Sequence, residues 1–215
     1  MNIHRFQNRR QAGQRLAEAL GSYAGQPDLC VLGLPRGGVP VAFEVARALD
    51  APLDVLVVRK LGVPGHTELA LGALGPGGQI VLNPDVVHAL RLTREEIAVI
   101  ARDEQEELER REAAYRQGEP ALDVQGKTVI VVDDGLATGA TMRAALAVLQ
   151  AEEPARLVVA VPVAAASACE SLRPGVDELV CLLSPSDFRA VGLWYQDFSQ
   201  TTDEEVRHLL DRARR

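Results

Sequence analysis

The sequence predicts a single α/β domain built on a mainly parallel, twisted sheet flanked by helices. Short apolar runs rich in β-branched residues alternate along the chain with stretches of helical spacing, which is typical of strands joined by crossover helices. The 215 residues are 47% hydrophobic and 25% charged, an ordinary globular composition. Neither an internal repeat nor a linker-like stretch interrupts the chain, so we expect one domain over residues 1–215.

The strands of this sheet are expected where the apolar runs fall, and the helices between them. A first helix is predicted over about residues 8–20, where alanine and leucine side chains share one face. Further helices are expected after the first, third and fourth strands. The predicted strands are residues 29–34, 53–58, 128–132 and 157–161, with an edge strand at 178–183.

About 70 residues between the second and third strands break this alternation. We expect a hairpin there, with strands near 69–74 and 79–82 around the glycine-rich turn 75–78. Thr93 is predicted to cap a long helix running to about Tyr115, with an acidic residue at the capping-box position. Its many charged residues are interpreted as a solvated face with pairs spaced three and four apart, not as a binding surface.

Charge and cysteine content exclude several classes of function. With 23 basic and 30 acidic side chains the formal charge is −7, so we expect no nucleic-acid or membrane partner. No apolar run reaches the length of a spanning helix, and the first residues lack the apolar stretch of a secretory signal, which predicts a cytoplasmic protein. Three dispersed cysteines are expected to be small buried hydrophobic residues: Cys30, Cys169 and Cys181.

The most informative segment is VIVVDDGLATGATM, residues 129–142. A buried strand leads into Asp133 and Asp134, then into a loop of small residues and threonines at the start of a helix. Backbone N–H groups and a helix N-terminus at the carboxyl end of a parallel strand suit a phosphate, while the two acids suit sugar hydroxyls or magnesium. Two alternatives are a response-regulator acid pair, which follows the first strand in those proteins, and a plain strand-turn-helix. A P-loop is excluded because the loop has no lysine.

This segment resembles the phosphoribosyl pyrophosphate signature of type I phosphoribosyltransferases, and GLPRGGVPVA and VVRKLGVPGHTELALGA resemble the subgroup called predicted phosphoribosyltransferases. The resemblance covers most of the chain and implies the type I phosphoribosyltransferase fold, a magnesium-dependent transfer to a nitrogenous acceptor and a homodimer. It places the ribose hydroxyls and magnesium on Asp133 and Asp134. The 5′-phosphate is placed on Ala137, Thr138, Gly139, Ala140 and Thr141.

A second anion-binding loop, GLPRGG, follows the first strand at the same edge of the sheet. Its Arg36, Gly37 and Gly38 occupy the place of the family's pyrophosphate loop, and by analogy the Pro35–Arg36 peptide is a candidate for the cis form. The alternative is a turn with a surface arginine. If the strand order reverses between the first and third strands, the crevice between the two loops is the topological switch point.

The second strand is expected to end in Arg59 and Lys60, followed by a glycine-rich, mobile segment that contains His66. In orotate-type relatives a basic loop of this character closes over pyrophosphate, so these three residues are candidates for screening the leaving group. Arg59 and Lys60 are counted with the acid pair as catalytic candidates.

The acceptor is left open by the sequence. Ala137 stands where hypoxanthine-type relatives carry an aspartate, so a hypoxanthine-type base mechanism is not expected. In FRAVGLWYQDF, near the C-terminus, loose analogy with oxopurine enzymes lets Trp194 stack on the acceptor and Asp197 approach magnesium. The alternative is an aromatic plug that packs the tail on the core. A regulatory module that binds the donor without turnover is the alternative function.

Overall fold

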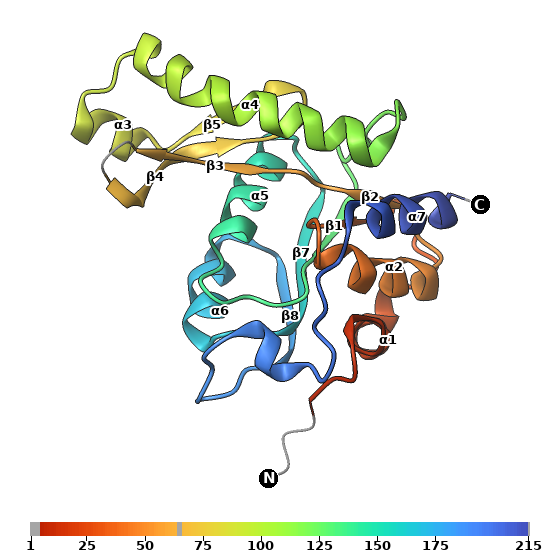
Figure 1. The fold of residues 1–215 in the computed structure, drawn as a ribbon. Coiled ribbons are helices and arrows are strands. Elements are labelled where there is room, and N and C mark those ends of the chain that lie inside the picture. The colour runs from red at the N-terminus through yellow and green to blue at the C-terminus, as the bar shows by residue number, and fades with distance from the viewer. Residues whose placement is uncertain (1–4, 64–65, 215) are drawn as a thin grey trace.

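The computed structural model describes residues 5–63 and 66–214 and confirms the predicted α/β architecture. Five parallel strands form the main sheet in the order β2-β1-β6-β7-β8 (Figure 1). The strands are β1 (Leu29–Gly33), β2 (Leu53–Val55), β6 (Thr128–Val132), β7 (Arg156–Val163) and β8 (Glu178–Leu183). The chain moves from β1 to β2 on one side and later places β6 on the other side of β1, so the topological switch point lies between β1 and β6.

Helices cover both faces of this sheet. Successive strand residues point to opposite faces, so Val31 and Ile130 pack with one group of helices while Leu32 and Val131 pack with the other. The first group is α1 (Arg9–Ala19), α2 (Gly38–Leu49) and α7 (Asp203–Ala213); the second is α5 (Ala140–Ala151) and α6 (Ala166–Leu172). Helices therefore follow the first, third and fourth predicted strands, as expected. Short 3₁₀ turns complete the connections at Gly21–Tyr23, Pro76–Gly78, Arg173–Gly175 and Val191–Trp194.

A smaller antiparallel sheet, in the order β3-β4-β5, stands beside the main one (Figure 1). Its strands are β3 (Arg59–Val63), β4 (His66–Leu74) and β5 (Ile80–Leu82). The predicted hairpin corresponds to β4 and β5 and is confirmed. The prediction for residues 56–63 was wrong: β2 ends at Val55, and residues 59–63 form a strand instead of a mobile loop. Leu61 and Val63 alternate into the core at 0% and 7% exposure, and this burial outweighs the flexibility that glycine suggested.

Helix α3 (Pro84–Leu90) and the long α4 (Arg94–Arg116) connect this hairpin to β6. The predicted capping box is present at the start of α4. The Thr93 hydroxyl accepts a hydrogen bond from the Glu96 N–H at 3.2 Å, and the Glu96 carboxylate accepts one from the Thr93 N–H at 2.8 Å. Pairs such as Glu107 with Arg110 and Arg111 line the solvated face.

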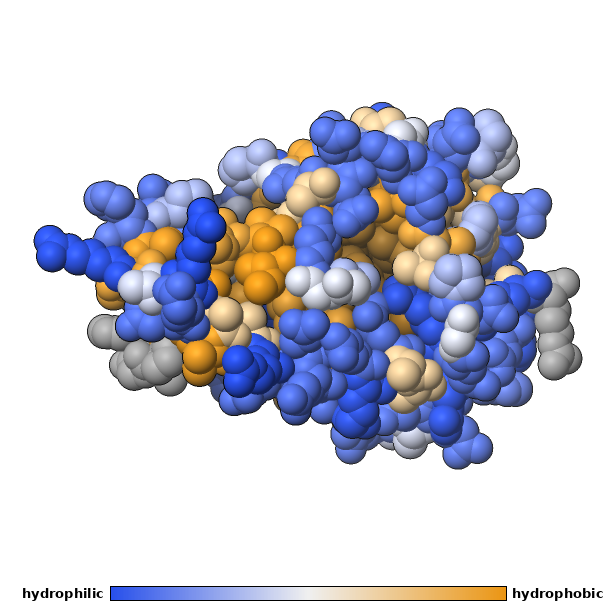
Figure 2. Space-filling model, turned by 90° about the horizontal axis from the view of Figure 1, so that it is seen from above, coloured by the Kyte–Doolittle hydropathy of each residue, from blue (hydrophilic) through white to orange (hydrophobic). Residues whose placement is uncertain are grey.

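The surface combines hydrophilic residues with smaller hydrophobic patches, as Figure 2 shows for the face seen from above. Ile80, Leu82 and Val99 are large hydrophobic residues exposed on β5 and α4. Among the described residues, no helix is long and apolar enough to cross a membrane. Cys30 and Cys169 are buried as predicted, whereas Cys181 is only partly buried.

Candidate functional site

The two sequence motifs lie side by side because the strands that precede them are neighbours. Gly33 at the end of β1 is in register with Val132 at the end of β6. The Leu34 N–H donates to the Val132 carbonyl at 2.9 Å, which continues the pairing into both loops. The carboxyl ends of parallel strands meet at one edge, so the GLPRGG loop and the acid pair lie together at that edge of the sheet.

The acid pair follows β6 in a largely buried position. The Asp133 carboxylate accepts a hydrogen bond from the Asp134 N–H at 2.8 Å. Burial raises the pKa of Asp133 well above its usual range, and the neighbouring charge on Asp134 raises it further. Burial also raises the pKa of Asp134, against the opposing effect of Arg9. Two carboxylates in this setting are stabilised by a ligand that brings positive charge or hydroxyl donors.

Arg9 on α1 supplies a cation to this pair. Its Nε lies 2.8 Å from Asp134 Oδ2, and the two side chains are 12% and 14% exposed. Arg9 was not predicted from the sequence, because 125 positions separate it from Asp134 and it stands in an ordinary run of basic residues. Only the packing of α1 against the sheet brings them together.

The loop of small residues ends at the N-terminus of α5. Ala137, Thr138 and Thr141 are exposed, and Thr138 Oγ1 accepts a hydrogen bond from the Ala140 N–H at 3.3 Å. Gly139 precedes the helix with a φ of +69°, a conformation that glycine adopts without strain. Because Gly139 has no side chain, Thr138 supplies the cap for the Ala140 N–H, and the next N–H groups of the first turn have no partner inside the helix and can bind an anion.

The GLPRGG loop packs directly on the acid pair. A Cβ on Gly37 would lie 2.0 Å from Asp134 Oδ2, and one on Gly38 would lie 2.6 Å from the Val132 carbonyl oxygen. Only glycine fits at these two positions. The Pro35–Arg36 peptide is cis, as the analogy suggested. The exposed Arg36 points to α7, where its Nη1 lies 3.9 Å from the Asp203 carboxylate.

Arg59 and Lys60 are ordered on β3, which corrects the expectation of a mobile segment. Adjacent strand residues point to opposite faces, and this separates the two cations. Arg59 Nε lies 2.5 Å from the Glu104 carboxylate of α4. Lys60 lines an open cavity of about 520 Å³ between the hairpin and α5, together with Thr138, Ala140 and Arg143. His66 begins β4, but its side chain lies outside the described residues.

Arg143 was also missed by the sequence analysis. Its Nη1 donates to the Thr138 carbonyl at 2.9 Å and to the Ser171 hydroxyl at 3.2 Å, so it braces the loop of residues 137–141 against α6. Its position on the first turn of α5, directly after the motif, is a signal that could have identified it.

The aromatic segment near the C-terminus packs on the core, as the second of the two interpretations of FRAVGLWYQDF predicted. Trp194 is 8% exposed and packs with Phe6 and Val163, so its ring is not presented to an acceptor, contrary to the stacking expectation. Its neighbour Tyr195 reaches the site instead and donates its hydroxyl to the Asp134 carbonyl at 2.6 Å. Asp197 is exposed, and hydrogen bonds from Ser199 hold its pKa below the usual range.

The acid pair fits a magnesium ion only with help from a substrate. Within residues 5–63 and 66–214, no three histidine, cysteine or acidic side chains converge into a metal site. Magnesium in proteins is commonly held by one or two carboxylates plus substrate phosphates and water. Asp133 and Asp134 satisfy this pattern when a phosphorylated ligand supplies the remaining oxygens.

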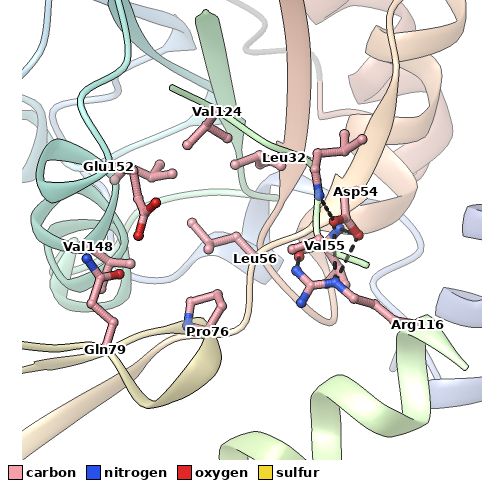
Figure 3. A pocket seen from close by; sticks show the side chains of 13 residues that line it. Leu32, Asp54, Val55, Leu56, Pro76, Gln79, Arg116, Val124, Val148 and Glu152 are labelled. Carbon is pink, nitrogen blue, oxygen red and sulfur yellow. Dashed lines mark hydrogen bonds and ion pairs between the residues drawn. The ribbon is translucent and has the colours of Figure 1, made fainter. Parts of the chain in front are cut away.

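A second cavity, shown in Figure 3, shares no lining residue with the cavity beside Lys60. It measures about 100 Å³, and its walls include Leu32, Leu56 and Val148. At one side the buried Arg116 guanidinium lies 3.3 Å from the Asp54 carboxylate and donates to the Val55 carbonyl at 2.8 Å. These groups tie α4 to β2.

Comparison with known proteins agrees with this geometry. Residues 1–196 match the family described as "Phosphoribosyl transferase domain". A protein of Mycobacterium tuberculosis (strain CDC 1551 / Oshkosh) named "Putative phosphoribosyl transferase MT0597" is 48% identical over 210 residues, covering 98% of this chain and 47% of the relative. The chain thus spans about half the length of that curated relative.

Two further matches extend the comparison. "Bifunctional protein PyrR" of Roseiflexus sp. (strain RS-1) is 31% identical over 155 residues, covering 71% of this chain and 65% of that protein. The crystal structure of TT1426 from Thermus thermophilus superposes with a TM-score of 0.89 at 48% identity, covering 96% and 97% of the two chains.

Proposed function

Because the chain belongs to the phosphoribosyl transferase domain family, we propose that it is a magnesium-dependent phosphoribosyltransferase. It transfers the phosphoribosyl group of phosphoribosyl pyrophosphate to a nitrogenous acceptor, most simply a nucleobase. A carbon–nitrogen bond forms at the anomeric carbon as the bond to the pyrophosphate oxygen breaks, and pyrophosphate leaves. The observation that carries this proposal is the meeting of two glycine-containing loops and an acid pair at the switch point between β1 and β6.

The two loops divide the donor between them. In this proposal the N–H groups from Ala137 to Thr141 and the N-terminus of α5 bind the 5′-phosphate, and Asp133 and Asp134 accept hydrogen bonds from the ribose hydroxyls. The Gly37 N–H binds the pyrophosphate, and Gly38 completes this loop with its own N–H donated to the Leu34 carbonyl at 3.0 Å. The absence of side chains at both glycines lets this loop pack directly against Asp134 and Val132, which brings the two halves of the proposed donor site together.

Cations at the rim complete the pyrophosphate site. Arg36 leaves Asp203 for the pyrophosphate, a small loss because a 3.9 Å pair that is almost half exposed is worth at most about 1 kcal/mol. Lys60 faces the cavity beside Thr138 and stabilises the leaving charge. Arg59 and His66 stay secondary candidates on the same hairpin, and Trp194 is not retained as a stacking residue.

Asp133 and Asp134 are the residues that hold magnesium in this proposal, with Asp197 as a more distant candidate. When bound, the ion neutralises charge on the departing pyrophosphate. The protein's own contribution is to hold both ends of the donor, to orient the anomeric carbon and to keep the carboxylates beside it.

A regulatory module that binds the donor without turnover is the second candidate. One observation favours it: two of the expected pyrophosphate cations are engaged within the protein, Arg36 with Asp203 and Arg59 with Glu104. Lys60 on the cavity wall favours the enzyme, because a sensor of the 5′-phosphate alone has no use for it.

The deciding experiment measures magnesium-dependent pyrophosphate release from phosphoribosyl pyrophosphate with a panel of nucleobases and small amines. Release with any acceptor supports the enzyme, whereas tight donor binding without release supports the regulatory module. Asp134→Asn is expected to weaken donor binding severely, and Lys60→Ala to lower turnover more than binding. Lys127→Ala is the matched control, because Lys127 is the chain's other lysine and precedes β6 at the opposite edge of the sheet. Equal, small effects of Asp134→Asn and Lys60→Ala contradict the assigned site.

We further propose a cytoplasmic homodimer that uses small-molecule substrates and has no nucleic-acid or membrane partner. The net charge of −7 and three thiols without a disulfide support this setting. Light scattering coupled to gel filtration measures the oligomeric state, and a monomer at micromolar concentration would contradict this part of the proposal.

A further inference from the structure

Three segments of the chain outside α1 converge on the side chain of Arg9. Its Nε donates to Asp134 Oδ2 at 2.8 Å, and its Nη1 donates to the Ser199 carbonyl at 2.6 Å. Its guanidinium lies over the Phe198 ring, 4.0 Å from the centroid. The GLPRGG loop is also adjacent, since a Cβ on Gly37 would lie 3.1 Å from Arg9 Nε. The side chain is 12% exposed, so these contacts are shielded from solvent.

The neighbouring arginine shows that this arrangement is specific. Arg10 stands on the same helix, its side chain is 69% exposed, and its Nε lies 3.4 Å from Glu44, which also pairs with Arg47 at 2.6 Å. Arg10 therefore has a solvated position and a partner with a second cation. Arg9 alone of this adjacent pair connects α1 to the acid pair.

The tail that Arg9 contacts is itself attached to the start of the chain. The Phe6 N–H donates to the Trp194 carbonyl at 2.8 Å, and the Gln196 N–H donates to the Phe6 carbonyl at 2.8 Å. The Asp197 N–H donates to the Gln7 carbonyl at 2.9 Å. Tyr195 of this tail reaches the Asp134 carbonyl, so the tail and Arg9 contact the same acid.

We propose that Arg9 is a positioning residue of the donor site, which holds Asp134 against the GLPRGG loop and fastens the C-terminal tail beside it. This inference rests on the proposed function for its account of the donor. With Oδ2 engaged by Arg9, Oδ1 of Asp134 is the oxygen assigned to the donor. An arginine suits this position because its planar group donates from two different nitrogens, Nε and Nη1, to separated acceptors while its face lies over a ring, whereas a lysine has a single nitrogen for all these contacts.

The test compares Arg9→Gln, Arg9→Lys and the matched control Arg10→Gln. Calorimetry measures the Kd for phosphoribosyl pyrophosphate, and hydrogen exchange measures the opening of the Gln196 and Asp197 amides with and without this donor. Arg9→Gln is expected to weaken binding by about 10- to 100-fold, the range for loss of a charged hydrogen bond, and to speed exchange of both amides. Arg9→Lys restores part of the affinity but not the slow exchange, and Arg10→Gln behaves as the wild type.

The outcomes separate this inference from the proposed function. If the wild-type chain does not bind the donor, the proposed function is refuted. Hydrogen exchange of the Gln196 and Asp197 amides without donor then still tests whether Arg9 holds the tail in place. Equal behaviour of Arg9→Gln and Arg10→Gln overturns the inference, as does weaker binding with unchanged tail exchange. If Arg9→Gln does not fold, Phe198→Ala removes the stacked ring from a 37% exposed position and is expected to speed the same amides. Unchanged exchange in Phe198→Ala counts against the role of Arg9.

Discussion

Gly37→Ala tests whether the contact between the two loops builds the donor site. Gly37 has φ −64° and ψ −29°, which alanine adopts freely. At an open position this substitution stabilises a protein by about 0.4–1 kcal/mol through the unfolded state. Here the new Cβ would lie 2.0 Å from Asp134 Oδ2 and 2.7 Å from its Cγ. Because a carbon–oxygen contact normally exceeds about 3.3 Å, the carboxylate or the loop has to move by about 1.3 Å.

That movement opposes the ion pair between Arg9 and Asp134 and overfills the site. Overpacking costs about 1–3 kcal/mol and a charged hydrogen bond contributes about 1.5–3 kcal/mol, so we expect a net destabilisation of about 1–3 kcal/mol. For a chain of this size each kcal/mol lowers Tm by about 2–4 °C. Donor binding is expected to fall at the same time, because the displaced carboxylate belongs to the donor site.

Thermal unfolding and donor titration measure both effects, with Gly21→Ala as the control. A Cβ on Gly21 meets nothing within 4 Å, so its effect should stay within about 0.5 kcal/mol of the wild type or be stabilising. A Gly37→Ala protein as stable as the wild type, with unchanged donor Kd, would refute the steric reasoning and the assignment of this loop to the site.

Three further predictions concern charge and capping. Burial and the neighbouring charge raise the pKa of Asp133, so its ionised form destabilises the fold above that pKa, and the cost disappears as the pH falls through it. Asp133→Asn should therefore have a higher Tm than the wild type at pH 8, and this difference in Tm should become smaller toward pH 5. The same substitution should abolish donor binding. A Tm below that of the wild type at pH 8 contradicts this prediction. Arg116→Met leaves Asp54 buried without its cation and should cost about 3–5 kcal/mol in urea unfolding, with an unchanged donor Kd in the folded protein. Thr93→Ala removes the capping box of α4 and should cost about 0.5–2 kcal/mol by the same measurement, and no loss would show that tertiary packing alone fixes this helix end.

The strand, acid pair and small-residue loop of residues 129–142 could be predicted from the sequence because their determinants are local. A fully buried strand, two acids at its carboxyl end and small residues before a helix all lie within residues 129–142. The parallel sheet follows from the same kind of signal, repeated strand by strand. These features depend on the order of neighbouring residues and not on distant contacts.

The remaining parts of the site depend on tertiary packing. No local pattern distinguishes Arg9 from Arg10, yet one is buried against Asp134 and the other is solvated. Trp194 and Tyr195 are adjacent aromatic residues that are both buried with Phe6, and only the tertiary pairing of the tail shows that the Tyr195 hydroxyl is the group that reaches Asp134. The strand β3 was missed for a related reason, since its glycine and basic residues concealed the alternation of Leu61 and Val63.

The proposed donor site concentrates features that disfavour the folded state without a ligand. Two carboxylates with raised pKa lie side by side, and glycines occupy positions where backbone freedom is lost on folding. The fully buried strands beneath, from Val129 to Val132 and from Val158 to Val161, supply the apolar burial that offsets this cost. A ligand that brings hydroxyl donors and positive charge removes part of the repulsion, so binding and stability are coupled at this edge of the sheet. Substitutions that remove the repulsion between Asp133 and Asp134 should therefore stabilise the fold and, at the same time, abolish donor binding. This trade-off distinguishes a site selected for binding from a surface selected for folding alone.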